Sequence, residues 1–416
     1  MILEKNTHGI LVPVVILLCI GIIMVYSSSA FMSTEKYGNS FHYVWKHLFT
    51  VLIGFMGMIF FVKLDYQDIK RFVIPLLVFS FILLILVFVP GIGMSAGAKS
   101  TVKRWINMRL LTFQPSELVK IAMVIFLSKY ISKNANRMNT LRYGIMIPIA
   151  VMVVFQGIIL LQPDFGAAMS IGIITLTLLI IGGIRWRYIV SVIAVSIPAV
   201  IVLIIAVPYR LKRILAFIDP WKDSQGAGYQ LIQSFYAFGM GWITGVGIGN
   251  SKQKLYFLPE AHTDFIFSLI GEETGLIGTI IVVGLFVYLL IRGFKIAMQA
   301  EDSFGYYLAI GLTVMIGSQA LINFAVSTGL MPTKGLPLPF ISYGGSALLV
   351  NMMAVGILIN ISKNCFSPLI STTRFQTQLG SKLSRNADKG DFNYISMGKP
   401  RGGRISMPVS RWKRYK

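Results

Sequence analysis

The sequence predicts an all-α polytopic integral membrane protein with about ten transmembrane helices and with both termini on the cytoplasmic side. Hydrophobic residues make up 55% of its 416 positions, and charged residues only 13%. The mean hydropathy of +0.72 lies far outside the usual range of soluble domains. The apolar runs and the distribution of basic residues lead to the rest of the prediction.

The apolar runs are long enough to cross a bilayer, because a hydrocarbon core of roughly 30 Å needs about 20 helical residues. The first run ends in Ser27-Ser28-Ser29-Ala30, which could imitate a signal-peptidase site, but its length favours a retained helix. We predict spans at residues 10–31, 46–62, 72–90, 113–131, 144–161, 165–183, 189–207, 264–291, 304–329 and 343–362.

Basic residues indicate the orientation of these spans. The tail from Lys363 to Lys416 carries twelve Lys or Arg against Asp388 and Asp391. By the positive-inside rule this tail is cytoplasmic, and an even number of spans places the amino terminus on the same side. The loops expected on that side each contain Lys or Arg, and they are residues 63–71, 132–143, 184–188 and 292–303.

The chain is predicted to have two parts. Residues 1–364 form the ten-helix membrane domain, with a large extracytoplasmic loop at about 208–263. Residues 365–416 are basic and are predicted to be disordered, since they cannot bury enough apolar surface to fold alone. For this tail, attachment to anionic lipid is favoured over nucleic-acid binding. Cys19 and Cys365 have no partner spacing for a metal site or a disulfide framework.

Basic residues also occur in the outward loops at 91–112 and 208–263, against the charge rule. They indicate either an anionic ligand or contact with outer-leaflet headgroups. Trp105 is an aromatic suited to the membrane interface. A last outward loop, residues 332–346, is rich in Pro and Gly and is expected to be buried in protein or to line a cavity. The candidate cations of these loops are Arg104, Arg210, Lys212, Arg213 and Lys334.

Three further ionisable residues lie at or inside predicted spans, where charge is costly unless it faces protein or water. Glu117 and Lys120 are three apart, so they are neighbours on one helical face and could neutralise one another. Alternatively, they form a polar pair in a substrate cavity. Asp164, between the fifth and sixth spans, is either a helix cap or an acidic wall of the same cavity.

The stretch Leu258–Gly275 holds four of the sixteen acidic residues of the chain. Proline disrupts a helix interior, so a helix is expected to begin just after Pro259, with His262 or Thr263 near its cap and Asp264 in its first turn. The Asp264 carboxylate could serve the helix dipole alone. It could also act as a base at the outer membrane boundary.

Helix geometry separates the acids of this stretch. Asp264 and Glu272 are eight residues apart, about 12 Å along a helix axis, which is too far for a paired-carboxylate site. Glu272 and Glu273 are expected to pair with other spans, while Glu260 is placed to contact a ligand from the loop. A lone carboxylate suits an inverting group transfer, in which it removes a proton from an attacking hydroxyl.

At these residues the chain resembles the SEDS family (shape, elongation, division and sporulation) of polytopic peptidoglycan polymerases, over roughly residues 10–364. The segment before Asp264 and Pro332–Gly335 are most similar to the cell-division subgroup, whereas Pro337 is common in the elongation subgroup. The motifs that carry the resemblance are Lys103–Asn107, Phe113–Glu117, Leu161–Asp164, Gly228–Gln230, Leu258–Phe267 and Leu338–Ser346.

The resemblance implies a peptidoglycan glycosyltransferase that joins lipid II units at the outer face of the bacterial cytoplasmic membrane, for septal synthesis in cell division. It places the essential aspartate of the family on Asp264, as general base. The cations would bind the diphosphate leaving group, with Trp105 at the sugar or lipid boundary and Glu260 and His262 beside the substrate. Alternatives are an elongation polymerase, a lipid II flippase and a structural scaffold.

The resemblance also implies protein partners. These are a class B penicillin-binding protein, whose transpeptidase crosslinks the new strands, and other membrane proteins of the division machinery. No nucleic acid is expected. No cofactor is evident from the sequence, and no paired His or Cys has metal-ligand spacing. A divalent cation that bridges the diphosphate and an acid stays open.

Overall fold

The structure is a computed structural model, which describes residues 2–95, 103–107 and 112–364. The basic tail at 365–416 and Cys365 lie outside the described residues. In the described part, ten helices correspond to the ten predicted spans: α1 (Ile2–Tyr37), α2 (His42–Lys63), α4 (Val73–Leu86), α5 (Pro115–Asn134), α6 (Ile147–Leu161), α7 (Phe165–Ile181), α8 (Trp186–Ile205), α11 (Ile266–Gln299), α12 (Ser303–Ser327) and α13 (Gly345–Lys363).

Eight of these segments are long and apolar enough to cross a membrane. The other two have physical reasons to be weaker candidates. Helix α7 is apolar but has only 17 residues, and α5 has 20 residues but carries Glu117 and Lys120. Short helices precede two spans: α3 (Tyr66–Ile69) and the 3-10 turn η1 (Lys70–Phe72) lead into α4, and the π-helical turn η3 (Arg142–Met146) leads into α6.

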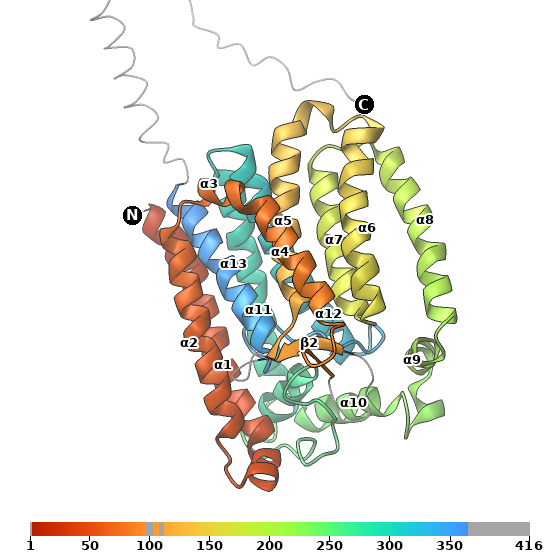
Figure 1. Cartoon of the computed structure of the whole chain (residues 1–416). Coiled ribbons are helices and arrows are strands. Elements are labelled where there is room, and N and C mark those ends of the chain that lie inside the picture. Colours follow the sequence, from red (N-terminus) through yellow and green to blue (C-terminus); the bar gives the residue numbers. More distant parts are fainter. Residues whose placement is uncertain (1, 96–102, 108–111, 365–416) are drawn as a thin grey trace, which may run out of the picture. The chain divides into compact units, whose positions relative to one another are not determined.

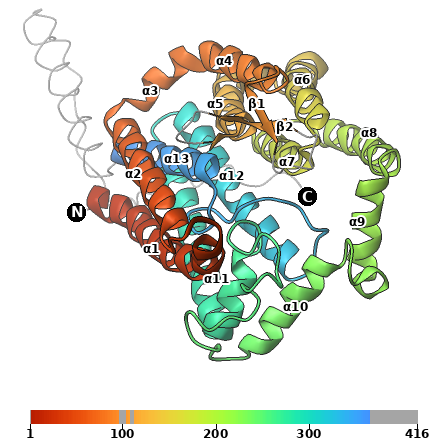
Figure 2. The same ribbon diagram turned by 60° about the horizontal axis from the view of Figure 1, so that its bottom comes forward.

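The remaining short elements lie in the loops. The 3-10 turn η2 (Ala135–Arg137) follows α5. In the large outward loop, α9 (Pro208–Ile218), η4 (Pro220–Asp223) and α10 (Tyr229–Gly241) follow one another, and Figure 2 shows α9 between α8 and α10.

A small sheet in the loop after α4 was not expected from the sequence. Its strands β1 (Gly93–Ser95), β2 (Lys103–Asn107) and β3 (Thr112–Phe113) are antiparallel in the order β1-β2-β3. The strands are too short to give a convincing alternation of apolar and polar residues. Ile106 is buried with Leu83 and Val87 of the fourth helix and the turn after it, which holds the sheet against the bundle.

Helix α1 begins, and helix α13 ends, at the same face of the domain. Thr7 Oγ1 of α1 lies 3.4 Å from Ser362 Oγ of α13. Figure 1 shows these ends at the face of α3, whereas β2, α9 and α10 lie at the opposite face. Both ends of the helical domain therefore lie on the side that the positive-inside rule makes cytoplasmic.

The helices differ in how much of their surface they bury. Most residues of α12 and α13 are buried, and α13 packs so closely on α2 that a Cβ at Gly356 would lie 2.5 Å from the carbonyl oxygen of Met58. Small residues permit this approach between membrane helices. In α8, by contrast, only Ile189 is buried. One helix at the periphery is thus only loosely attached to the bundle.

Helix α11 is broken at Gly275, whose φ of 67° and ψ of −163° are not helical. The loop after α10 supplies the missing hydrogen bonds: Leu276 N and Ile277 N donate to the carbonyls of Trp242 and Ile243 over 3.0 and 3.2 Å. Irregular backbone at membrane depth needs such internal partners. A Cβ at Gly275 would lie 2.4 Å from Ile243 O, so only glycine fits this junction.

The two glutamates before the break point away from the cavity described below. Glu273 accepts a hydrogen bond from Ser27 of α1 over 2.5 Å and forms an ion pair with Lys254 over 3.3 Å. Glu272 accepts from Lys252 N over 2.9 Å and from Ser251. The prediction that Glu273 pairs with another span is confirmed, whereas Glu272 binds the preceding loop.

Candidate active site

A cavity of about 1830 Å³ extends between α6, α7 and α8 and reaches the loops that carry Asp264 and Lys334. Its polar end is formed by the segments around Asp264, Lys334 and Asp164, together with Arg104 of β2 and Arg213 of α9. The rest of its lining is mainly aliphatic and comes from α6, α7 and α8. The cavity therefore joins a charged end at the membrane boundary to an apolar region between three spans.

Asp264 lies in a tight turn just before α11, which begins at Ile266. The prediction that Asp264 belongs to the first helical turn is therefore wrong by about half a turn. The turn forms because the Glu260 carbonyl accepts from the N–H groups of Thr263 and Asp264 over 3.1 Å each and of Phe265 over 3.3 Å. No side chain caps α11 by a hydrogen bond, so Asp264 does not act as a cap.

The environment of Asp264 favours its neutral form. The pKa of this carboxyl is raised from 3.8 to about 7, mainly by burial and also by the charge of Glu260, while Arg213 and Arg104 oppose the rise. Part of the side chain nevertheless stays open to the cavity. A carboxyl whose pKa lies near neutrality and that faces a cavity is suited to accept a proton.

Lys334 presents a charge to the cavity from an apolar surface. Its Nζ lies 4.5 Å from the centroid of the Phe165 ring and 3.0 Å from the sulfur of Met169. No carboxylate of the described residues forms an ion pair with it, and burial lowers its pKa to about 8. A cation in such surroundings is stabilised by an anionic ligand.

Backbone carbonyls orient three arginines at the cavity. Arg104 donates through Nε to Gln162 O over 3.1 Å and through Nη2 to Pro163 O over 2.7 Å. Arg213 donates to Thr333 O over 3.0 Å, and Arg210 donates to Leu203 O over 2.9 Å. These acceptors carry no formal charge, and they fix the directions of the guanidinium groups.

Four further predicted residues line the cavity. Trp105 pairs with Met94 in the sheet, and Glu260 is exposed and accepts from Thr263 Oγ1 over 3.0 Å. The centroid of the His262 ring lies 5.8 Å from that of Tyr343, and burial lowers the pKa of His262.

Asp164, the fourth, combines both predicted roles, because it caps α7 at Ala167 N over 3.1 Å while it lines the cavity. The same carboxylate accepts from Gln114 Nε2 over 2.8 Å and from Ser116 Oγ over 3.1 Å. Asp164 therefore also braces the start of α5 against the start of α7.

The chain matches the family model of the FtsW, RodA and SpoVE cell cycle proteins over residues 8–365. It belongs to this family. A probable peptidoglycan glycosyltransferase FtsW of Trichlorobacter lovleyi is 45% identical over 353 residues, which cover 85% of this chain and 92% of the relative. An FtsW of Geobacter metallireducens with the same description is 42% identical over 360 residues, 86% of this chain and 95% of the relative.

More distant members share the fold. Stage V sporulation protein E of Bacillus subtilis is 38% identical over 86% of this chain and 98% of its own length. A solved structure reported for the coordination of polymerization and crosslinking by a peptidoglycan synthase complex has a TM-score of 0.70 and 26% identity, over 85% of this chain and 97% of that chain. RodA of Thermus thermophilus has a TM-score of 0.63 and 23% identity, over 86% and 97% of the two chains.

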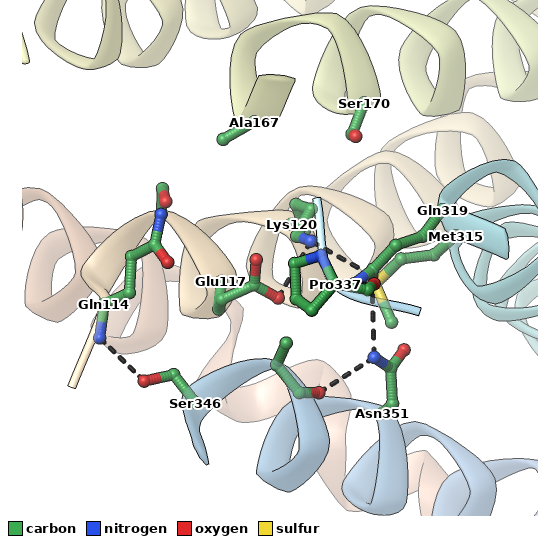
Figure 3. Close-up of polar contacts among 12 residues, drawn as sticks. Gln114, Glu117, Lys120, Ala167, Ser170, Met315, Gln319, Pro337, Ser346 and Asn351 are labelled. Carbon is green, nitrogen blue, oxygen red and sulfur yellow. Dashed lines mark hydrogen bonds and ion pairs between the residues drawn. The ribbon is translucent and has the colours of Figure 1, made fainter. Parts of the chain in front are cut away.

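Three predicted binding residues of this family member do not line the cavity. Lys212 is exposed on α9 and turns away, although its neighbour Arg213 points inward, because adjacent helical residues face different directions. Glu117 and Lys120 do form the predicted pair, with 2.8 Å between Glu117 Oε2 and Lys120 Nζ. The pair is buried between α5, α12 and α13 and lies outside the lining of the cavity (Figure 3).

Two site residues were missed by the sequence reasoning. Asn323 of α12 donates from Nδ2 to the backbone oxygen of Asp264 over 2.8 Å, and Gly335 lies against the Asp264 carboxylate. A buried asparagine within a span was a signal that could have been used. Gly335 gave no such signal, because its role depends on two loops that are 71 residues apart in the sequence.

Adding a methyl group at Gly335 is expected to disturb Asp264. A Cβ there would lie 2.9 Å from Asp264 Oδ2, closer than real Cβ contacts, so the carboxylate must shift. For Gly335→Ala we expect a loss of kcat of about 10- to 100-fold, since small misplacements of reacting groups have effects of this size. This kcat is measured by steady-state kinetics of glycan polymerisation. Gly284→Ala in α11, where a Cβ meets no neighbour, is the matched control. Equal kcat for both variants would contradict the assignment.

Proposed function

We propose that the chain polymerises lipid II into glycan strands at the outer face of the cytoplasmic membrane. The observation that carries this proposal is the cavity itself. It combines a carboxyl with a pKa near 7, a lysine facing an apolar wall, and an aliphatic region between spans. These features match a hydroxyl to be deprotonated, an anionic leaving group and a lipid chain. The names of the most similar relatives support the same activity.

The proposed reaction is a displacement at a sugar carbon. Asp264 takes the proton of the 4-hydroxyl of the incoming lipid II sugar, and that oxygen attacks the anomeric carbon of the growing glycan. The bond from the anomeric carbon to undecaprenyl diphosphate breaks with inversion, and the bonding electrons leave with the diphosphate. Lys334, Arg104, Arg210 and Arg213 line the cavity where they can stabilise the developing negative charge.

The apolar part of the cavity is the proposed place of the undecaprenyl chain. Its walls carry aliphatic side chains such as Ile149 of α6, Ile173 of α7 and Val195 of α8. Because α8 is loosely attached to the bundle, this region can be reached from the surrounding lipid. The polyprenyl chain would thus stay in an apolar environment while its diphosphate meets the cations.

We place this activity at the division septum, with a class B penicillin-binding protein as partner. The high identity to proteins named FtsW supports the division role over the elongation role. The likeness to a chain from a peptidoglycan synthase complex that coordinates polymerization and crosslinking supports a transpeptidase partner.

The residues of the cavity fit a resident metal poorly. Within the described ranges, no group of three or more His, Cys, Asp or Glu side chains could hold a metal ion. A divalent cation would therefore need phosphate oxygens of the substrate as ligands. The proposed reaction does not depend on such an ion.

Purified protein with its transpeptidase partner and labelled lipid II tests the proposal. We expect polymer resolved as a ladder on a denaturing gel, with release of undecaprenyl diphosphate. A flippase would instead move lipid II across vesicle membranes and make no polymer. If no polymer forms with the partner present while lipid II crosses the vesicle membrane, the protein is a flippase and not a polymerase.

The pH dependence of polymerisation is expected to be bell-shaped. Asp264 must be ionised to accept a proton, so the rate falls as pH drops through about 7. Lys334 must be charged, so the rate falls again as pH rises through about 8. Lys334→Arg should remove only the alkaline limb, because arginine stays protonated. A flat profile of kcat between pH 5.5 and 9, measured as initial rates, would contradict both assignments.

A further inference from the structure

Helix α12 carries two buried amide side chains, Gln319 and Asn323, one helical turn apart on the same face. Buried amides within a membrane span are costly unless they are hydrogen-bonded. Both donate to backbone carbonyls outside their own helix. These carbonyls belong to the segments that form the polar end of the cavity.

Asn323 connects the two segments that carry Asp264 and Lys334. Its Nδ2 donates over 2.8 Å to the backbone oxygen of Asp264 and over 2.8 Å to that of Leu336. Leu336 follows Lys334 by only two residues. One buried amide group therefore fixes the main chain of the proposed base relative to that of the proposed anion-binding lysine.

Neighbouring contacts make the connection rigid. Gln319 donates from Nε2 to Pro337 O over 2.9 Å, and its Oε1 accepts from Lys120 over 3.3 Å (Figure 3). Tyr343 N donates to His262 O over 3.0 Å, which is a second bond between the same two segments. The loop after Lys334 is thus attached to α12 at two successive carbonyls.

We propose that Asn323 is a positioning residue for Asp264, which sets the distance and direction between the catalytic carboxylate and the cation of Lys334. This inference rests on the proposed function of Asp264 as the base. Asn323 touches neither substrate nor reacting atoms, since it does not line the cavity. Its effect passes through the main chain of both segments.

The rate should depend on this amide because a base acts over hydrogen-bond distances. A displacement of about 1 Å can lower a rate by about 10²-fold. Loss of the amide would also let water approach Asp264. The charged groups that face this carboxyl are Glu260 of its own turn, Arg213 of α9, Arg104 of β2 and Asp164 before α7. Burial outweighs them, so hydration should move the acid limb of the rate profile to lower pH.

The test compares Asn323→Ser with Asn323→Ala, because the two side chains have similar volume but only serine can donate one hydrogen bond. We expect kcat to fall about 10- to 100-fold in the alanine variant and less in the serine variant, with KM changed by less than about threefold. The acid limb of the profile should move to lower pH in the alanine variant. Rates are measured with the intact protein and its partner, below the thermal midpoint of each variant.

Asn360→Ala is the matched control. Its amide also holds backbone carbonyls, those of Phe61 and Val62 over 3.1 Å each, but at the opposite face of the domain. We expect this variant to lose thermal stability while it keeps kcat and the acid limb of the wild type. Equal rates for Asn323→Ser and Asn323→Ala, or a loss of kcat in Asn360→Ala as large as in Asn323→Ala, would reduce Asn323 to a packing role and overturn the proposal.

The assignment of Asp264 as the base and the assignment of Asn323 as a positioning residue can be disproved separately. Full activity of Asp264→Asn would show that Asp264 is not the base. Wild-type kcat in Asn323→Ala, together with an inactive Asp264→Asn, would overturn only the positioning role. If the alanine variant does not fold, the serine variant alone decides, because a wild-type rate and pH profile would then exclude a need for both hydrogen bonds.

Discussion

Asp264→Asn is expected to lower the rate of lipid II polymerisation by about 10²- to 10⁴-fold, the usual contribution of a positioned general base. An amide of nearly the same shape cannot accept the proton of the sugar hydroxyl. KM should change little, because the cations that bind the diphosphate are untouched. The measurement is the initial rate of polymer formation by wild-type and variant protein with the same partner.

The variant should remain folded, which separates catalysis from stability. Burial raises the pKa of the Asp264 carboxyl to about 7, so its neutral form already occurs near neutral pH, and a neutral amide of nearly the same shape fits the same place. Glu301→Gln removes an exposed carboxylate in the turn between α11 and α12, at the opposite face, and is the matched control. A normal rate in Asp264→Asn would show that another group is the base, and Glu260 would then be the next candidate.

The sequence predicted the helices well because each span is an independent physical unit. An apolar run of sufficient length must cross the bilayer wherever its neighbours lie. The short strands around Trp105 and the break at Gly275 depend instead on contacts between distant segments. The chain leaves the helix at Gly275, for example, because carbonyls of the loop at Ile243 accept the hydrogen bonds of the next two N–H groups. No local pattern contains that information.

The sequence predicted those residues of the candidate site that are recognisable from their residue type and their place in the chain. Asp264 stood out as a lone acid at the mouth of a span, and the structure places it in the cavity. Adjacent residues on α9 could not be distinguished, because the direction of Lys212 and Arg213 depends on how the helix packs. Asn323 acts on backbone oxygens, and a sequence does not show which carbonyls approach a side chain.

The pair of Glu117 and Lys120 leads to the second large expected effect. Lys120→Met leaves the Glu117 carboxylate without its partner among buried helices, where both side chains are at most 3% exposed. Removing one partner of such a pair lowers the free energy of unfolding by about 3–5 kcal/mol. The thermal midpoint of the purified variant in detergent should therefore fall strongly, with loss of activity that follows loss of folded protein.

The double variant Glu117→Gln/Lys120→Met distinguishes a structural pair from a substrate site. Replacing both ions removes the unpaired charge, and such replacements are often neutral for stability. Because neither residue lines the cavity, we expect the double variant to regain most of its thermal stability and most of its polymerisation rate. If it regains stability but stays inactive at saturating lipid II, the pair contributes to the reaction itself. That result would mean that the pair acts on the site through Gln319, which accepts from Lys120 and donates to the carbonyl of Pro337 in the loop that carries Lys334.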